Sequence, residues 1–269
     1  MKQEKLTYNL APGNILQNMY LERRLKNLRK TTFIELGSGN GNISAMLLNS
    51  GMSGIGFDLS ETACDLNRKK NGSYIKDGMY QVEEADFFDY KGAKVDVIIS
   101  SHVIEHFPDE LLDQYFSKCE SLLNRGGVII SLVPSSMKYW GIEDETVGHY
   151  RRFEFEYFEK IAIDNGFIVK NMSGLTYPLS NLLFGLSNYL INKNDGWKKS
   201  LSKDEQTELS SSGGARQIKF KTNFPYWFRT ILNEFTMYPF YLLQLIFRKN
   251  KNSMVIYCEY QLPPAKADC

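Results

Sequence analysis

The segment TTFIELGSGNGNISAML, residues 31–47, constrains the fold more than any other part of the chain. An apolar run typical of a strand ends near Glu35, glycines follow at positions 37, 39 and 41, and a pattern typical of a helix begins directly after them. Glycines at such a turn let the chain reverse tightly and let a ligand approach the backbone, with the helix amino terminus behind it. The segment therefore predicts a strand, a ligand-binding loop and a helix.

Further strand and helix patterns alternate along the chain. Strand patterns lie at residues 53–60, 80–90, 95–103, 126–135, 167–175 and 253–262. Helix patterns lie between them, at residues 42–50, 61–72, 109–127 and 154–167, and we expect them to stop at turn residues such as Asn71-Gly72 and Gly126-Gly127. Strands separated by helices of this length predict an α/β fold with a doubly wound, Rossmann-like, mostly parallel sheet.

Residues 175–251 interrupt the alternation before the last strand pattern. We expect an N-terminal helical cap at 1–30, a core at 31–174 and 252–262, and a helical insertion at 175–251 that serves as a lid, a specificity element or a subunit contact. The polar stretch at 192–217 predicts a loop. The apolar run at 235–247 contains Pro239 and is shorter than the roughly 20 residues of a membrane span. A buried helix is expected there, and an interfacial helix flanked by Arg229, Arg248 and Lys249 is the alternative.

Composition indicates an ordinary globular protein. The chain has 269 residues with a formal net charge of +1, and its four cysteines lie far apart without metal-ligand spacing, which favours reduced thiols in a cytoplasmic protein. The first residues lack the apolar run of a secretory signal. Residues 193–251 hold 11 Lys/Arg and 5 Asp/Glu, a net charge of +6, which leaves −5 for the rest. Such a basic segment suits an anionic substrate, a membrane surface or nucleic acid, or is simply solvated.

The glycine spacing and three carboxylates indicate the kind of cofactor. The dinucleotide fingerprint is GxGxxG, whereas this loop reads GxGxG. Glu35, before the loop, suits a cofactor that carries an amino group and positive charge. Asp58, at the end of the second strand, can accept hydrogen bonds from a ribose diol. Asp86, at the end of the third strand beside Phe87, can accept one from an adenine amino group, which the dinucleotide fingerprint does not require.

These motifs occur in the order seen in a known enzyme class. ELGSGNG, the Asp58 of GFDLS, the Asp86 of EADFF, VDVIISSHVIEHF and GGVIISLVP resemble the motifs of class I S-adenosylmethionine-dependent methyltransferases over about residues 30–172. The resemblance implies a seven-stranded sheet with S-adenosylmethionine across its carboxyl edge, S-adenosylhomocysteine as the product, and no NAD. It also implies a set of cofactor-binding residues: Glu35, Gly37, Ser38, Gly39, Gly41, Asp58, Leu59, Ala85, Asp86, Phe87, Ser100, Ser101 and His102.

The three histidines, His102, His106 and His149, are the candidate catalytic residues. The first two lie at the carboxyl end of the fourth strand, where ligands bind in such sheets. The sequence HVIEH allows three interpretations: a structural turn, a general base, or a metal site. As a metal site it resembles the Glu-x-x-Glu-His motif of small-RNA 2′-O-methyltransferases and ubiquinone-pathway O-methyltransferases, but His102 stands where the first Glu would be. A divalent metal is therefore possible and not favoured, although His149 would extend the set around Glu105.

The segment GHYRRF, residues 148–153, resembles one found in the same methyltransferase class, and it supplies candidate acceptor-binding residues. Arginines favour a phosphate, phosphonate or carboxylate on the acceptor. Alternatively, the two arginines pair with Glu154 or Glu156. The expected acceptor-binding residues are Tyr139, His149, Tyr150, Arg151 and Arg152.

The functional hypothesis is therefore an S-adenosylmethionine-dependent methyltransferase that methylates oxygen on a small polar or anionic acceptor. A sugar, phosphate or phosphoramidate-type group, such as one of a surface glycan, fits this hypothesis. A lipid-linked or quinone-like acceptor is the variant. From other classes, an NAD-dependent oxidoreductase and a non-catalytic cofactor-binding scaffold remain open. A small molecule is the expected partner rather than nucleic acid, with peripheral membrane contact possible, and the protein is a monomer or a homodimer.

Overall fold

The computed structural model describes residues 11–28, 30–203, 205–206 and 231–264. One seven-stranded sheet has the order β3-β2-β1-β4-β5-β7-β6, and β7 alone runs antiparallel to its neighbours. This confirms the predicted fold class. The strands are β1 (Thr32–Leu36), β2 (Ser53–Asp58), β3 (Tyr80–Glu84), β4 (Val95–Ser101), β5 (Leu123–Pro134), β6 (Ile168–Leu175) and β7 (Val255–Gln261).

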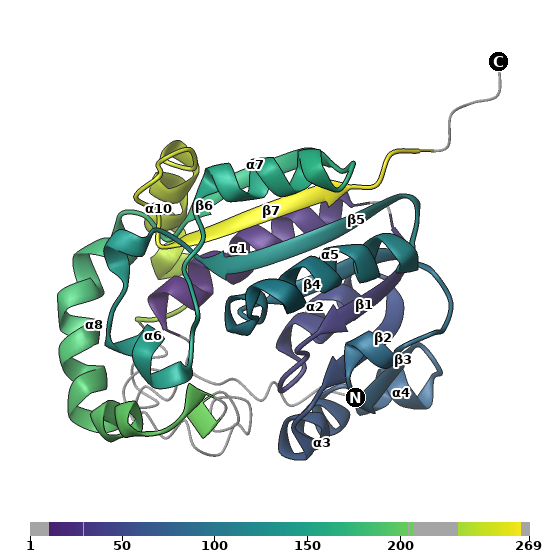
Figure 1. Ribbon diagram of the computed structural model, residues 1–269, viewed down its shortest axis with the longest axis horizontal. Helices are drawn as coiled ribbons and strands as arrows, with labels where there is room; N and C mark the ends of the chain where they lie inside the picture. Colours follow the sequence, from purple (N-terminus) through teal and green to yellow (C-terminus); the bar gives the residue numbers. More distant parts are fainter. Residues whose placement is uncertain (1–10, 29, 204, 207–230, 265–269) are drawn as a thin grey trace.

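Helices cover both faces of this sheet (Figure 1). The α-helices are α1 (Pro12–Asn27), α2 (Asn42–Asn49), α3 (Glu61–Lys70), α4 (Gly72–Lys76), α5 (Asp109–Leu122), α6 (Ile142–Val147), α7 (Phe155–Asp164), α8 (Leu179–Asp195) and α10 (Glu234–Ile246). Short 3₁₀ turns are η1 (Phe87–Asp89), η2 (Ile104–His106), η3 (Met137–Tyr139) and η4 (Gly196–Ser200).

The core has two halves because successive strand residues point to opposite faces of the sheet. On β4, Ile98 packs into the half covered by α5 and α7, whereas Val97 and Ile99 pack into the half covered by α1, α2 and α10. A strand buried on both faces needs apolar residues at consecutive positions, which explains the run VDVIIS.

One predicted helix end was wrong. Helix α5 ends at Leu122 rather than at the glycines, because Leu123 adopts an extended backbone and begins β5 beside Val95. Asn71 ends α3 as predicted, and Gly72 directly starts a further short helix, α4.

The stretch between β6 and β7 contains α8, η4 and α10. Part of the predicted polar loop is the ordered turn η4, and the rest of that loop, like residues 1–10 of the predicted cap, lies largely outside the described residues. Helix α10 packs against α1 through Met237 and Tyr241, and its Gln244 amide donates to the Leu16 carbonyl. Among the described residues, no helix is both long and apolar enough to cross a membrane.

Candidate active site

The glycine loop connects β1 to α2 in a left-handed backbone conformation. The φ angles of Gly37 and Gly41 are +68° and +76°, values that residues with a Cβ rarely adopt. A Cβ at Gly37 would lie 2.4 Å from Val103 Cγ2, and one at Gly41 would lie 2.3 Å from Asn67 Oδ1. By contrast, nothing lies within 4 Å of the Cβ position of Gly39, so a ligand can approach the loop there.

Glu35 is held behind the loop, in a buried polar network. Its side chain is 2% exposed, and its Oε2 accepts a hydrogen bond from Ser44 Oγ at 2.5 Å. Ser44 Oγ and the Tyr80 hydroxyl are 2.7 Å apart, and Asn67 Nδ2 donates to Tyr80 and to Ser38 Oγ, at 3.0 Å each. Burial raises the pKa of Glu35 to about 8, with a smaller contribution from Asp58 and an opposing one from Ser44. The carboxyl group therefore stays protonated in the folded protein at neutral pH.

Asp58 stands beside the same loop, at the end of β2. Its Oδ2 accepts the Gly39 N–H at 2.8 Å and its Oδ1 accepts the Ser60 N–H at 3.0 Å. Burial raises the pKa of Asp58, although both backbone donors oppose the shift. The side chain of the following residue, Leu59, is exposed. The carboxylate of Asp58 thus lies at the edge of the glycine loop, and an exposed apolar side chain follows it.

The residues predicted for the adenine lie at the end of β3, but they face different ways. Asp86 is exposed, and its Oδ1 accepts the Phe88 N–H at 2.9 Å. Ala85 is partly buried against the core. Phe87 is fully buried and packs edge-on against Phe57, so its side chain is part of the core rather than of a ligand-facing surface.

Ser100 and Ser101, at the end of β4, were both predicted to bind the cofactor, but the Ser100 side chain points into the core. Its hydroxyl and that of Tyr115 are 3.1 Å apart, and both groups are buried. Ser101 is partly buried at the strand end, and His102 follows with a φ of +56°. This left-handed residue turns the chain out of the sheet toward η2, and its Nε2 lies 2.9 Å from Gln17 Oε1 of α1.

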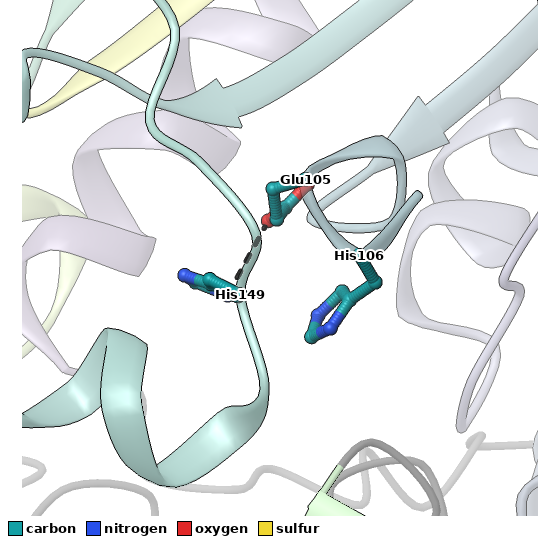
Figure 2. Close-up of side chains that lie close together, drawn as sticks. All are labelled: Glu105, His106 and His149. Atoms are coloured by element: carbon teal, nitrogen blue, oxygen red, sulfur yellow. Dashed lines mark ion pairs between the residues drawn. The ribbon is translucent and has the colours of Figure 1, made fainter. Parts of the chain in front are cut away.

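Three histidines surround one buried carboxylate at this strand end, and we call His102, Glu105, His106 and His149 the histidine cluster. Figure 2 shows Glu105 and His106 projecting from η2 toward His149 on a separate segment. Glu105 Oε1 lies 3.4 Å from His102 Nδ1 and 3.8 Å from His149 Nε2, and the His106 and His149 rings meet edge to face at 4.7 Å. A backbone hydrogen bond of 2.9 Å from Tyr150 N–H to the Glu105 carbonyl joins the two segments.

Glu105 is unusual because its side chain is 0% exposed. Neither of its oxygens has a hydrogen-bond partner among the described residues. Burial alone would raise the pKa of Glu105, but His102, and then His149 and His106, lower it below its ordinary value. The carboxylate is therefore ionised and is stabilised by imidazole rings rather than by backbone donors.

Asp144, which the sequence analysis missed, fixes His149 from the other side. Its Oδ1 lies 2.7 Å from His149 Nδ1, and both of its oxygens accept from Arg152 Nε, at 2.9 and 3.0 Å. Burial would raise the pKa of Asp144, but the hydrogen bond from His149 and the charge of Arg152 lower it. Because an ionised carboxylate can only accept, Nδ1 carries the proton and Nε2 is turned toward Glu105. The sequence signal that could have indicated this pair is its spacing. His149 follows Asp144 by five residues, which span the last turn of α6 and Gly148.

The predicted acceptor residues are distributed differently from the prediction. Arg152 is buried on Asp144 and the Ser135 carbonyl, and Arg151 pairs with Asp109 and donates to the Phe107 carbonyl. Both guanidinium groups are therefore used within the protein, as in the structural alternative, although their partners are not Glu154 and Glu156. The Tyr139 ring packs edge-on against Phe184.

Tyr150 is exposed next to His149, and the ammonium group of Lys203 lies over its ring. Lys203 Nζ lies 3.8 Å from the ring centroid, which is a cation–π contact. The stretch between β6 and β7 therefore places a positive charge beside the histidine cluster. No sequence pattern pointed to Lys203 individually.

The cluster also has the composition of a metal site. One ligand atom each of Glu105, His106 and His149 lies within 4.8 Å of the others. An imidazole and carboxylate set suits Zn²⁺, Mn²⁺ or Fe²⁺ better than an all-oxygen set does, and a buried carboxylate that lacks a hydrogen bond fits a cation. The residues present therefore fit a divalent metal.

Comparisons with known proteins agree with this architecture. The family model described as a methyltransferase domain matches residues 34–129. A ubiquinone biosynthesis O-methyltransferase of Chelativorans sp. (strain BNC1) is 24% identical over 176 residues, 59% of this chain and 68% of that protein. An uncharacterized methyltransferase of Bacillus cytotoxicus is 27% identical over 162 residues, 55% of this chain and 72% of that protein.

Among solved structures, Haemonchus contortus phosphoethanolamine N-methyltransferase 2, in complex with S-adenosyl-L-methionine, aligns with a TM-score of 0.55 and 17% identity. The alignment covers 92% of this chain and 52% of that one, so this chain spans about half of its length, and the likeness concerns the fold. The matched domain contains the glycine loop, Asp58 and the β4 strand end described above. Residues 34–129 therefore form a methyltransferase domain, and the comparisons support an enzyme that uses S-adenosylmethionine.

Proposed function

We propose that this methyltransferase transfers its methyl group to an oxygen atom, and that the histidine cluster lies at the reacting end of the cofactor site. The supporting observation is the contact between Val103 and the glycine loop: Val103 directly follows His102, two residues before Glu105, and it fills the space that a Cβ of Gly37 would occupy. The cluster is therefore adjacent to the loop that would hold the methionine part of the cofactor. The relative from Chelativorans is an O-methyltransferase, which supports oxygen as the acceptor atom.

In this proposal, S-adenosylmethionine supplies an already activated methyl group, so the protein has to orient the acceptor and remove its proton. Gly37, Ser38, Gly39 and Gly41 form the loop on which the cofactor lies, and Asp58 accepts from its ribose hydroxyls. The exposed Asp86 accepts from the adenine amino group, whereas the side chain of Phe87 is buried in the core and does not contact the adenine. Glu35 acts indirectly, by anchoring α2 and the loop through Ser44.

A histidine of the cluster would take the proton from the acceptor hydroxyl. Asp144 keeps the proton of His149 on Nδ1, so Nε2 is the basic atom, an arrangement in which one group orients the base. Glu105 then stabilises the positive charge that forms on the imidazole rings. His106, whose ring meets that of His149 edge to face, is the second candidate for the base.

The acceptor is proposed to be polar or anionic, of the sugar, phosphate or phosphoramidate class. The support is the Lys203 ammonium on the Tyr150 ring, together with the net charge of +6 over residues 193–251. Arg151 and Arg152 are not proposed to bind the acceptor, because their guanidinium groups are already paired.

The test has two stages. Calorimetric titration with S-adenosylmethionine, S-adenosylhomocysteine and NAD is expected to show binding of the first two alone. Methyl transfer is then measured against a panel of sugars, phosphorylated sugars, carboxylates and phenols, for the wild type, His106→Ala and His149→Ala. Loss of turnover by about 10²-fold or more with cofactor affinity retained supports a catalytic base. Methylation of amines but not hydroxyls would refute the proposal of oxygen transfer.

A metal-assisted version of this reaction is the second candidate. It is favoured by the buried Glu105 oxygens, which have no hydrogen-bond partner among the described residues. Glu105, His106 and His149 would hold the ion, which would lower the pKa of a bound acceptor hydroxyl. Calorimetric titration of the metal-free protein with Mn²⁺, Zn²⁺ and Mg²⁺ tests this, and Glu105→Gln should abolish binding. Undiminished binding by the variant would place the ion elsewhere.

A further inference from the structure

Two helices between β6 and β7 have outer faces that no described residue covers. On α10, the exposed apolar side chains are spaced three or four residues apart, and Phe235 is 89% exposed. On α8, they follow the same spacing, and Leu182 is 78% exposed. We call these side chains the apolar face: Leu182, Leu183, Leu186 and Tyr189 of α8, with Phe235, Tyr238, Leu242, Leu243, Ile246 and, just after it, Phe247 of α10. Soluble monomers rarely expose so many large apolar side chains together.

The helices lie at one end of the molecule, away from α3 and α4 (Figure 1). They meet where Tyr177, before α8, packs edge-on against Phe247, and where Asn181 Nδ2 donates to the Asn252 carbonyl at 2.7 Å. The amino-terminal end of α8 therefore lies next to the carboxyl-terminal end of α10.

Charge identifies the partner that fits this face. Residues 181–192 and 235–247 contain no charged residue, and the exposed Arg248 and Lys249 follow directly. The only acidic residue of α10 is Glu234, at its first position. An apolar stripe bordered by basic residues is the pattern of a helix that lies in a membrane interface and contacts anionic headgroups.

A second copy of the chain fits less well. A symmetric dimer through this face would bring two copies of the same segment together, each with a net charge of +6 over residues 193–251. We therefore propose that the apolar face of α8 and α10 docks the protein on an anionic lipid surface. Since α10 has 13 residues, it would lie in the interface and not cross the bilayer.

Docking there would bring the candidate active site close to the lipid. The inner side of α8 packs on the segment that leads into α6: Phe184 contacts Tyr139, and Asn188 lies against Gly141. Helix α6 carries Asp144, which orients His149. Because that segment packs on the inner side of α8 and the apolar face lies partly on its outer side, a lipid-linked form of the polar or anionic acceptor is favoured. This consequence rests on the proposed function, whereas docking itself does not.

Vesicle co-sedimentation of the full chain tests the docking. Vesicles of phosphatidylcholine alone are compared with vesicles that also contain phosphatidylglycerol, at low and high salt. The double variant Phe235→Ser/Ile246→Ser should bind about tenfold more weakly or worse. Arg248→Gln/Lys249→Gln should lose about tenfold on anionic vesicles and leave binding to neutral ones unchanged. Ile163→Ser, which removes an 81% exposed side chain of α7 outside the apolar face, is the matched control.

Each outcome has a definite meaning. Absence of vesicle binding by the wild type, or equal losses in the control and the double variant, would overturn the proposal. A concentration-dependent dimer that the double variant disrupts, without an effect on vesicles, would assign the face to a second copy. S-adenosylmethionine binding by the double variant, measured by calorimetry, should equal that of the wild type. If the wild type bound vesicles but did not bind S-adenosylmethionine, the proposed function would be refuted and the proposal of docking would stand.

Discussion

The protonated state of Glu35 makes a quantitative prediction for the variant Glu35→Gln. In the folded protein the pKa of Glu35 is about 8, against an ordinary value of 4.5. As the pH rises from about 4.5 to 8, the unfolded chain loses this proton and the folded protein keeps it. The wild type should therefore lose stability over this interval, fully retaining the contribution of Glu35 only below pH 4.5. At 1.36 kcal/mol per pKa unit, the difference is at most about 5 kcal/mol.

Glutamine has the same shape and an amide that can hydrogen-bond Ser44, but it does not titrate. Urea unfolding of both proteins, followed by circular dichroism at several pH values, gives the two free energies of unfolding. The gap in favour of Glu35→Gln should widen between about pH 5 and 8 and then level off. Glu83→Gln, at an exposed position of β3, is the control and should leave the pH dependence unchanged. Parallel stability curves for the wild type and Glu35→Gln would refute the inference that burial keeps Glu35 protonated.

Three further predictions concern the loop and the cluster. Gly37→Ala should weaken S-adenosylmethionine binding by about tenfold or more in calorimetry, because the new Cβ meets Val103 and φ is positive; unchanged affinity would contradict the loop's proposed role. Asp144→Asn should lower kcat by about 10²-fold with little change in cofactor affinity, because Nδ1 of His149 loses its carboxylate, and Asp144→Glu should restore part of the loss. Arg152→Lys should lower the free energy of unfolding by about 1–3 kcal/mol in urea denaturation and leave KM for the acceptor unchanged, because its guanidinium holds Asp144; a raised KM alone would return Arg152 to the acceptor site.

The parts of the site that the sequence predicted are local. The glycine loop, Asp58 and the strand end at His102 each follow from a few consecutive residues, since a turn and a strand end are encoded within them. Phe87 shows the limit of this reasoning: it stands next to the exposed Asp86, but its own side chain turns to the core. The sequence marks where a strand ends, and packing decides which face each following side chain takes.

The pairing within the site was not predictable, because it depends on contacts between distant segments. His149 meets Glu105 only because a loop after β5 folds back over the end of β4, and Gln17 reaches His102 from the N-terminal helix. Arg152 is next to Arg151 in the sequence, but the two guanidinium groups bind different elements. Charge and residue type alone did not distinguish an arginine aimed at a substrate from one buried on Asp144.

The position of β7 has a consequence for how such a chain can change. Leu175, at the end of β6, and Val255, at the start of β7, are partners in the sheet although residues 176–254 separate them. The segment 176–254 thus leaves and rejoins the sheet at neighbouring points. The entropy cost of closing a loop grows only slowly with its length. Evolution can therefore lengthen, shorten or replace this segment while the seven strands keep their register and the glycine loop keeps its conformation. Selection for a new acceptor, or for a new surface to bind, can therefore act on one exchangeable segment without disturbing the glycine loop that is proposed to hold the methyl donor.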